Sequence, residues 1–428
     1  MNLIKKIMAS IILCCFILCV QAQDLPLNIR LEVNDEDGVI INKNTIQAYL
    51  TVKNSDIQEV QFSAEWTILT DDWQPLKVVT LSETVEAGRS LRMDYPLFRF
   101  PAPGFYRIRV IVKQIGFDPQ NLEHVIGVDP EKITALKDGL QDLEEFWTRE
   151  IAGLAEIPPN YKLTPIKRES SKTNLFEVEM KSYNGLTVRG WLEVPKKKGV
   201  YPALLRVPGY QENIEPIDAA DDLIVFSFNT RDHGESDDSD GKATRSWDMW
   251  VRGLESIDNY YYKGLFLDCI RAMDFLETRK DVDQDRIAVW GGSQGGGLSF
   301  ATAALDDRVD LCIADIPFMC EFPKYFEITH WKEVDTWFSE HPKENWESIL
   351  NTLAYYDTKN LAHKIKCPVW MGIGLQDDVC PPATSFVTYN YIESEKSYVV
   401  YKNDYHSQPD EHYENRMKEL RAYLKNKK

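Results

Sequence analysis

Cysteine and positive charge are both scarce in this sequence. Only eight of its 428 residues are cysteine, and three of them, Cys14, Cys15 and Cys19, lie close to the N-terminus. The others are scattered, without the spacing of a metal site or the density of a disulfide framework; they are Cys269, Cys312, Cys320, Cys367 and Cys380. Lysine and arginine total 49 against 67 aspartate and glutamate, a net charge of −18. This excess of negative charge argues against nucleic acid or an anionic membrane as a partner.

Long apolar runs are also missing, except at the N-terminus. Lys5 and Lys6 give the chain a basic start, and residues 7–20 are apolar apart from one serine. A small residue, Ala22, then offers a cleavage site, and the run is too short for a membrane span. We therefore expect residues 1–22 to be a signal peptide and the protein to be exported, periplasmic or secreted. A lipid anchor on Cys19 is the less favoured alternative, because a bulky residue precedes it.

Residues 23–128 are expected to form an immunoglobulin-like β-sandwich. Apolar and polar residues alternate in several short segments separated by turn-forming residues, which is typical of antiparallel strands; the segments are 28–33, 45–52, 60–68 and 106–112. Trp66 and Trp73 could form a platform for a sugar, although a tryptophan in the core is the commoner interpretation. No catalytic set of residues is apparent in this domain.

Residues 129–428 have the alternating pattern of an α/β domain. A helical segment, 138–154, precedes a hairpin centred on 183–185. Short apolar segments that each end in a loop then alternate with helical ones, which predicts a doubly wound sheet with its site at the carboxyl ends of the strands; the strand segments are 203–207, 223–228, 287–290, 311–315, 368–373 and 397–401. We expect a long, aromatic-rich helical stretch, about 318–364, and a last helix at about 411–424.

A glycine-rich turn around Ser293 provides the candidate nucleophile. The apolar strand segment 287–290 leads directly into Gly291-Gly-Ser-Gln-Gly295, and a segment of small residues suited to a helix follows. This strand–turn–helix context is the one that a nucleophile elbow requires, and its glycines allow a strained, crowded turn. The alternative is an ordinary glycine-rich connection or a phosphate-binding turn.

Asp377 and His406 follow two later strand segments, in the order Ser, acid, His that α/β-hydrolases use. His406 would accept the proton of Ser293, and Asp377 would orient the imidazole. Asp378 is a rival for the acid. His412 lies at the start of the last helix and is interpreted as a surface residue. The N–H groups of Gln294 and Tyr210 are the candidates for the oxyanion hole; Tyr210 lies in the loop after strand segment 203–207.

The motifs of the chain from about residue 138 to its end resemble those of one family. They are Leu143-Glu-Glu-Phe-Trp147, Asp281-Val-Asp-Gln-Asp-Arg-Ile287, Gly291-Gly-Ser-Gln-Gly-Gly-Gly297, Asp315-Ile-Pro-Phe-Met-Cys320, Tyr355-Tyr-Asp357 and Gly374-Leu-Gln-Asp-Asp-Val-Cys-Pro-Pro-Ala-Thr384. Together they resemble the acetyl xylan esterase / cephalosporin-C deacetylase family, carbohydrate esterase family 7, of the α/β-hydrolase superfamily. The resemblance implies the same triad, Ser293, Asp377 and His406, and the same oxyanion residues, Tyr210 and Gln294.

The resemblance also implies the reaction, removal of acetyl groups from an acetylated carbohydrate such as xylan-derived oligosaccharide, with neither a metal nor an organic cofactor. Members of the family often form hexamers, so this chain could assemble into a homo-oligomer. It departs from the family at Arg231-Asp-His-Gly234, where the family has Arg-Gly-Gln-Gly, and at Ser407, where glutamate is usual. A serine peptidase of the same fold and a non-catalytic glycan-binding protein are the alternative functions.

Overall fold

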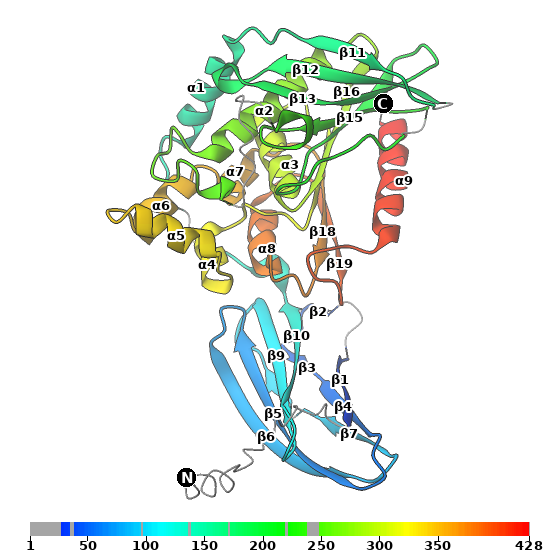
Figure 1. The fold of residues 1–428 in the computed structure, drawn as a ribbon, viewed down its shortest axis with the longest axis vertical. Coiled ribbons are helices and arrows are strands. Elements are labelled where there is room, and N and C mark those ends of the chain that lie inside the picture. The colour runs from blue at the N-terminus through cyan, green and yellow to red at the C-terminus, as the bar shows by residue number, and fades with distance from the viewer. Residues whose placement is uncertain are drawn as a thin grey trace, which may run out of the picture.

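The computed structural model describes residues 27–34, 38–95, 97–135, 138–169, 172–218, 221–237 and 248–427. The expected signal peptide, residues 1–22, lies outside these ranges, as do its three cysteines. Figure 1 shows a smaller part built from strands, coloured blue to cyan, below a larger part of mixed helices and strands.

The N-terminal strands form two main sheets that share one hydrophobic core. One sheet has the strand order β1-β4-β7 and the other β2-β10-β9-β5-β6, and a short ribbon pairs β3 with β8. Their bounds are β1 (Leu27–Val33), β2 (Val39–Ile40), β3 (Thr45–Ile46), β4 (Ala48–Asn54), β5 (Val60–Thr70), β6 (Pro75–Val85), β7 (Ser90–Asp94), β8 (Phe98–Arg99), β9 (Gly104–Lys113) and β10 (Gln120–Val128). The pairing is antiparallel except between β2 and β10.

Alternation along β5 explains how this core forms. Every second side chain from Val60 to Ile68 is buried, as expected when one face of a sheet is covered. Trp66 is one of them and is fully buried, so its interpretation as a sugar platform is wrong. Trp73, at the turn after β5, is 39% exposed.

The larger part contains a nine-stranded sheet of order β11-β12-β13-β15-β14-β16-β17-β18-β19. The strands are β11 (Lys162–Ile166), β12 (Thr173–Lys181), β13 (Thr187–Pro195), β14 (Tyr201–Arg206), β15 (Ile224–Asn229), β16 (Val282–Gly292), β17 (Leu311–Asp315), β18 (Val369–Gly374) and β19 (Lys396–Tyr401). β11, β12, β13 and β15 pair in antiparallel fashion, and the pairs from β15 through β14 and on to β19 are parallel. The predicted doubly wound sheet is confirmed.

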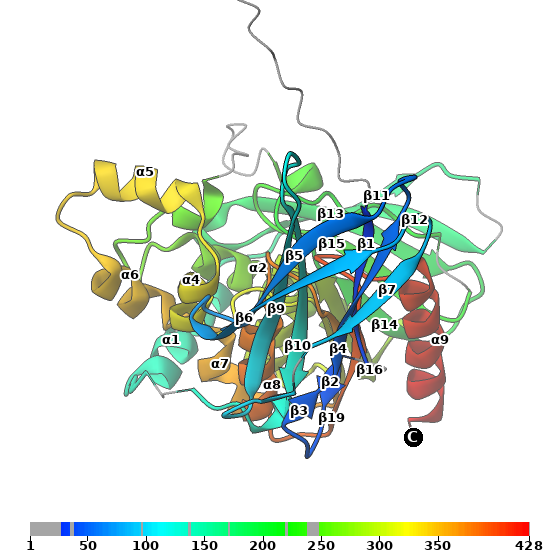
Figure 2. The same cartoon turned by 90° about the horizontal axis from the view of Figure 1, so that it is seen from below.

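Helices cover both faces of this sheet, as the two views in Figures 1 and 2 agree. The α-helices are α1 (Leu143–Ala155), α2 (Tyr261–Glu277), α3 (Gln294–Leu305), α4 (Phe322–Ile328), α5 (Lys332–Glu340), α6 (Trp346–Leu353), α7 (Thr358–Leu361), α8 (Pro382–Tyr391) and α9 (Asp410–Asn426). Short 3-10 turns are η1 (Pro130–Lys132), η2 (Tyr183–Gly185), η3 (Gly234–Ser236), η4 (Met249–Val251) and η5 (Ala362–Lys364). Apolar side chains of α9 pack on one face of the sheet, and those of α2, α3 and α8 on the other.

The expected helical stretch from 318 to 364 consists of several short helices. α5 ends before Pro342, and a proline disfavours a helical conformation in the residue before it. α6 begins at a capping box, in which the Asn345 side chain accepts the N–H of Ser348 and the Ser348 hydroxyl accepts the N–H of Asn345. These local signals divide the helical stretch into separate short helices.

All five cysteines in the described part of the chain are buried and none forms a disulfide. Burial raises the pKa of each thiol, which keeps the groups protonated. Among the described residues, no helix combines the length and apolar character needed to cross a membrane.

Candidate active site

Ser293 occupies a strained turn between β16 and α3. Its backbone has φ 58° and ψ −121°, an unusual conformation for a residue other than glycine. The backbone N–H of Ser293 donates to the oxygen of Asp315 at 2.9 Å, and its carbonyl accepts the N–H of Phe318 at 2.9 Å. These bonds to the chain after β17 hold the turn in its strained conformation.

Two glycines of the turn are required by close backbone contacts. A Cβ atom on Gly291 would lie 2.5 Å from the carbonyl carbon of Gly295. A Cβ atom on Gly295 would lie 2.6 Å from the oxygen of Val207. Neither contact leaves room for a side chain, so the glycines allow α3 to begin directly beneath Ser293 and against the end of β14.

His406 and Asp377 complete a hydrogen-bonded row with Ser293. His406 Nε2 is 2.9 Å from Ser293 Oγ, and His406 Nδ1 is 2.8 Å from Asp377 Oδ2. A carboxylate only accepts hydrogen bonds, so the neutral imidazole carries its proton on Nδ1 and presents Nε2 as the acceptor for the Ser293 hydroxyl. The three predicted residues, far apart in the sequence, therefore lie in one line of proton transfer.

The carboxylate of Asp377 is held by backbone N–H groups of the loop that follows it. Its Oδ1 accepts the N–H groups of Val379 at 2.9 Å and Cys380 at 2.8 Å, which leaves Oδ2 for His406. The Asp377 side chain is only 1% exposed, whereas Asp378 is exposed. The carboxylate at hydrogen-bond distance from His406 is thus that of Asp377 and not that of its rival.

His412, which the sequence placed on the surface, is buried. Its Nδ1 is 2.7 Å from the hydroxyl of Tyr401, and its Nε2 is 3.0 Å from Asp315 Oδ2. Asp315 also accepts the indole N–H of Trp290 at 2.7 Å. The surface interpretation was wrong because α9 packs its first turn against the end of β17, where a buried carboxylate requires a partner.

Tyr210 and Gln294 lie on the two segments that border Ser293. Gln294 is the first residue of α3, so its N–H has no acceptor within the helix. The loop before Tyr210 is braced by Glu212, whose Oε2 accepts the N–H of Gly209 at 2.6 Å. Gln294 Nε2 lies 3.4 Å from the oxygen of Gly209. Because C=O and N–H of a trans peptide point in opposite directions, this contact turns the N–H of Tyr210 away from the Gln294 side chain.

Sequence reasoning missed a buried hydrogen-bond chain around the Gln294 side chain. The hydroxyl of Tyr262 donates to Gln294 Oε1 at 2.9 Å, and burial raises the pKa of Tyr262 well above its usual value, so the donor keeps its proton. Gln294 Nε2 lies 3.1 Å from His233 Nε2. His233 Nδ1 lies 2.8 Å from the oxygen of Arg231, which can only accept, so His233 presents an unprotonated Nε2. The one sequence signal for this contact was the departure from the family pattern at residues 231–234, which places a histidine at position 233.

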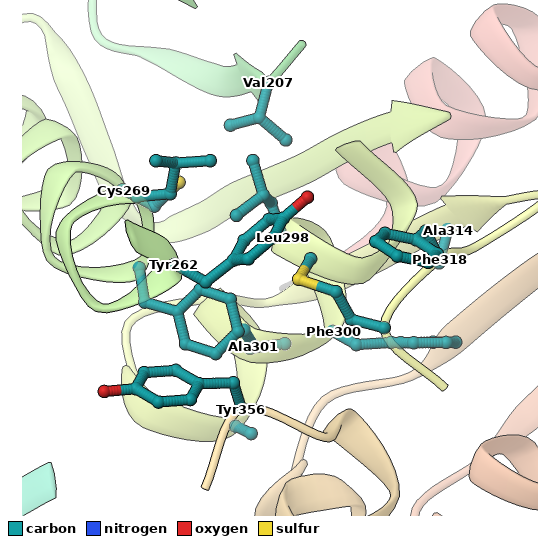
Figure 3. Packing of buried hydrophobic residues seen from close by; sticks show 14 of the residues in the cluster. Val207, Tyr262, Cys269, Leu298, Phe300, Ala301, Ala314, Phe318 and Tyr356 are labelled. Atoms are coloured by element: carbon teal, nitrogen blue, oxygen red, sulfur yellow. The ribbon is translucent and has the colours of Figure 1, made fainter. Parts of the chain in front are cut away.

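Aromatic residues lie around Tyr210 and the start of α3. Trp331, between α4 and α5, stacks on Phe318 with ring centres 6.0 Å apart and meets the ring of Tyr210 edge-on. Tyr262 lies in the core beside α3, as Figure 3 shows with Leu298 and Ala301. The stretch Tyr260–Tyr262 is buried and packs in the main core.

No group of three or more His, Cys, Asp or Glu side chains in the described ranges could hold a metal ion. The chemistry that these residues can perform is nucleophilic attack by a serine hydroxyl whose proton passes to a histidine.

Comparisons with known proteins agree on one family. The family model described as acetyl xylan esterase matches residues 132–424. A curated relative, the acetyl esterase Axe7A of Xylanibacter ruminicola, is 30% identical over 319 residues, which span 70% of each chain.

Two solved structures have a similar fold. The acetyl xylan esterase from Paenibacillus sp. is 29% identical, with a TM-score of 0.63 over 68% of this chain and 98% of its own. Acetyl xylan esterase 1 from Thermoanaerobacterium sp. is also 29% identical, with a TM-score of 0.63 over 68% of this chain and 97% of its own. The shared mixed sheet identifies the larger part of this chain as an α/β-hydrolase.

Proposed function

Since the chain belongs to the acetyl xylan esterase family, we propose that Ser293, His406 and Asp377 are the catalytic residues with which it removes O-acetyl groups from carbohydrates. Family membership makes the protein a carboxylic ester hydrolase. The observation that supports these roles is the unbroken row of hydrogen bonds from Ser293 Oγ through His406 to Asp377.

The row supports a two-step reaction. Ser293 Oγ attacks the acetyl carbonyl carbon while His406 Nε2 takes the hydroxyl proton, and Asp377 stabilises the resulting imidazolium. The C–O bond to the sugar then breaks, and His406 returns the proton to the leaving sugar oxygen. Water, deprotonated in turn by His406, attacks the acetyl-serine, and acetate leaves as Ser293 regains its proton.

The negative charge that forms on the carbonyl oxygen needs donors that are already in place. The backbone N–H groups of Gln294 and Tyr210 are the proposed oxyanion hole. The bracing of Gly209 by Glu212 and the contacts of the Gln294 side chain support this assignment, because both segments keep their geometry as the charge forms. One such donor is worth about 10²- to 10³-fold in rate.

Acetylated xylan, its oligosaccharides or a related acetylated glycan are the proposed substrates. The names of the relatives support this class, and a net charge of −18 suits a neutral sugar ester. The test compares p-nitrophenyl acetate and acetylated xylan with a long-chain p-nitrophenyl ester and with peptide substrates. We expect release of acetate and little turnover of the other two. Faster cleavage of peptides would favour the serine peptidase, and no turnover of any substrate would favour the non-catalytic glycan-binding protein.

The organisation of the chain is part of the same proposal. Residues 1–22 would be a signal peptide that directs the protein to the periplasm or the medium, residues 23–128 an immunoglobulin-like sandwich and residues 129–428 the catalytic domain. The separate hydrophobic core of the N-terminal sheets supports the division. A homo-oligomer remains part of the proposal by analogy with the family, and sedimentation velocity would test it.

A further inference from the structure

The side chain of Gln376, the residue before Asp377, reaches into the N-terminal domain. Its Oε1 accepts the backbone N–H of Val125 at 2.7 Å, and its Nε2 donates to the backbone oxygen of Val125 at 3.2 Å. Gln376 is 9% exposed, so these bonds are shielded from water. The amide therefore pairs with one residue of β10 as a neighbouring strand would.

The contact uses an edge that β10 leaves unpaired at this residue. β9 pairs with β10 on one side, and β2 reaches only Gly127 and Val128 on the other. The N–H and C=O of Val125 would be unsatisfied if Gln376 did not reach them, and buried backbone groups without partners are costly. Gln376 is thus the partner of β10 at this point.

The same residue also joins the two loops of the proposed triad. Gln376 Nε2 donates to the oxygen of Lys402 at 2.8 Å, and the backbone N–H of Gln376 donates to the oxygen of Asp404 at 2.9 Å. Lys402 and Asp404 lie between β19 and His406. Lys402 is itself tied to the N-terminal domain, because its Nζ donates to the oxygen of Val33 at 2.9 Å.

Close packing around Gln376 holds the N-terminal domain against the larger domain. Phe105 and Val125 lie on N-terminal strands, yet both pack in the main core of the larger domain. The ring of Phe105 lies 5.6 Å from that of Phe386 on α8. A Cβ atom on Gly38 would lie 2.3 Å from Leu375 Cδ2. The backbone of the N-terminal domain is therefore in contact with Leu375, two residues before Asp377. Figure 1 shows the ends of β9 and β10 beside α8 and β19.

We propose that Gln376 is a positioning residue, through which the N-terminal domain fixes Asp377 and the loop of His406 relative to Ser293. This inference rests on the catalytic roles proposed above. Downstream, Asp377 is fixed by the N–H groups of Val379 and Cys380. Upstream, its position depends on Gln376, whose side-chain partners come from another domain and another loop. In this proposal the N-terminal strands contribute to esterase activity, because they hold the two triad loops in position.

Gln376→Met tests the inference, because methionine keeps the length of the side chain and loses all three side-chain hydrogen bonds. A misplacement of about 1 Å can cost on the order of 10²-fold in rate. We therefore expect kcat on p-nitrophenyl acetate to fall about 10- to 100-fold, while KM changes little because Gln376 does not touch the ester.

Asn390→Ala is the matched control. Asn390 Nδ2 also donates to two backbone oxygens near the N-terminal domain, those of Pro130 at 2.9 Å and Ile133 at 2.8 Å in the segment that follows β10, but Asn390 lies on α8 and has no hydrogen bond to the triad. We expect this variant to lower the melting temperature and leave kcat unchanged.

A folded Gln376→Met variant with the kcat of the wild type would overturn the inference. If this variant does not fold, Gln376→Asn takes its place, because it keeps a polar amide too short to reach Val125 and Lys402 together; unchanged kcat there is equally decisive. Ser293→Ala, measured in parallel, distinguishes a failure of the role of Gln376 from a failure of the proposed mechanism. Its inactivity combined with normal activity at Gln376→Met overturns only the role of Gln376, whereas an active Ser293→Ala overturns the proposed mechanism.

Discussion

The backbone oxygen of Asp315 accepts the N–H of Ser293, while the carboxylate of Asp315 lies 3.0 Å from the Nε2 of His412. One residue thus joins the strained turn to the first turn of α9. Both side chains of the Asp315–His412 pair are about 5% exposed or less, so water cannot replace either partner.

His412→Leu is expected to destabilise the protein by about 1–3 kcal/mol, because it leaves a buried carboxylate with the indole of Trp290 as its remaining side-chain donor. Urea unfolding measures the loss. His330→Leu is the control, since His330 and Asp335 form a pair of similar length, 2.8 Å, with both side chains more than half exposed. Exposed pairs contribute about 0–1 kcal/mol. Equal losses in the two variants would show that burial of the His412 pair is not what stabilises it.

The chain from Tyr262 through Gln294 to His233 is expected to act as one unit. His233→Phe and Gln294→Leu should each lower kcat about 10-fold or more, because each lets the backbone of the first turn of α3 shift under the proposed oxyanion hole. The double variant should be little worse than either single one, as holds for residues that act together. Steady-state kinetics on p-nitrophenyl acetate measure all three.

His341→Phe controls for the loss of a histidine that bonds a backbone oxygen, since His341 Nδ1 lies 2.8 Å from the oxygen of Trp337. It should keep normal kcat. Fully additive losses at His233 and Gln294 would refute the coupling.

His124 should destabilise the folded protein in mild acid, opposite in sign to Asp357, whose pKa burial raises to about 7. Burial, with the nearby Lys402 as a smaller cause, lowers the pKa of His124 from 6.5 to about 4. Between these values the unfolded chain binds a proton at His124 that the folded protein does not, so the contribution of His124 to the free energy of unfolding decreases as the pH falls from 6.5 towards 4. One such group contributes a slope of up to about 1.4 kcal/mol per pH unit.

His124→Gln removes this titration, so on acidification across that range the free energy of unfolding of the variant should rise relative to that of the wild type, as measured by urea unfolding. His330→Gln, a substitution at an exposed histidine, is the control for the loss of an imidazole. An identical slope for His124→Gln and the wild type would contradict the assignment.

The sequence predicted the elements that bear the site because local patterns specify them. The run ending at Trp290 and the glycines around Ser293 specify a strand, a turn and a helix within about twenty residues. Asp377 and His406 could be placed because each follows a short apolar strand segment. The N-terminal strands were predictable from alternation, which depends on one buried face.

What could not be predicted depends on contacts between distant segments. His412 is buried because Asp315 needs a partner, and the hydrogen bond of His233 to Gln294 joins residues 61 apart. The contact between Gln376 and Val125 spans 251 residues and involves only backbone groups of Val125. The periodicity of apolar residues in the sequence does not predict such long-range pairs. The short edge strand β11 was missed because it contains Pro165 and has no buried residue, so it lacks the alternation that marks a strand.

The kcat/KM of Ser293→Ala on p-nitrophenyl acetate and acetylated xylan tests the central claim most directly. Ser394→Ala is the control, because its hydroxyl donates to the oxygen of Cys367 far along the chain from the proposed nucleophile. With both variants folded, as judged by circular dichroism and melting temperature, the mechanism predicts a fall of at least about 10³-fold for Ser293→Ala and wild-type activity for Ser394→Ala. Wild-type activity in a folded Ser293→Ala variant would contradict it.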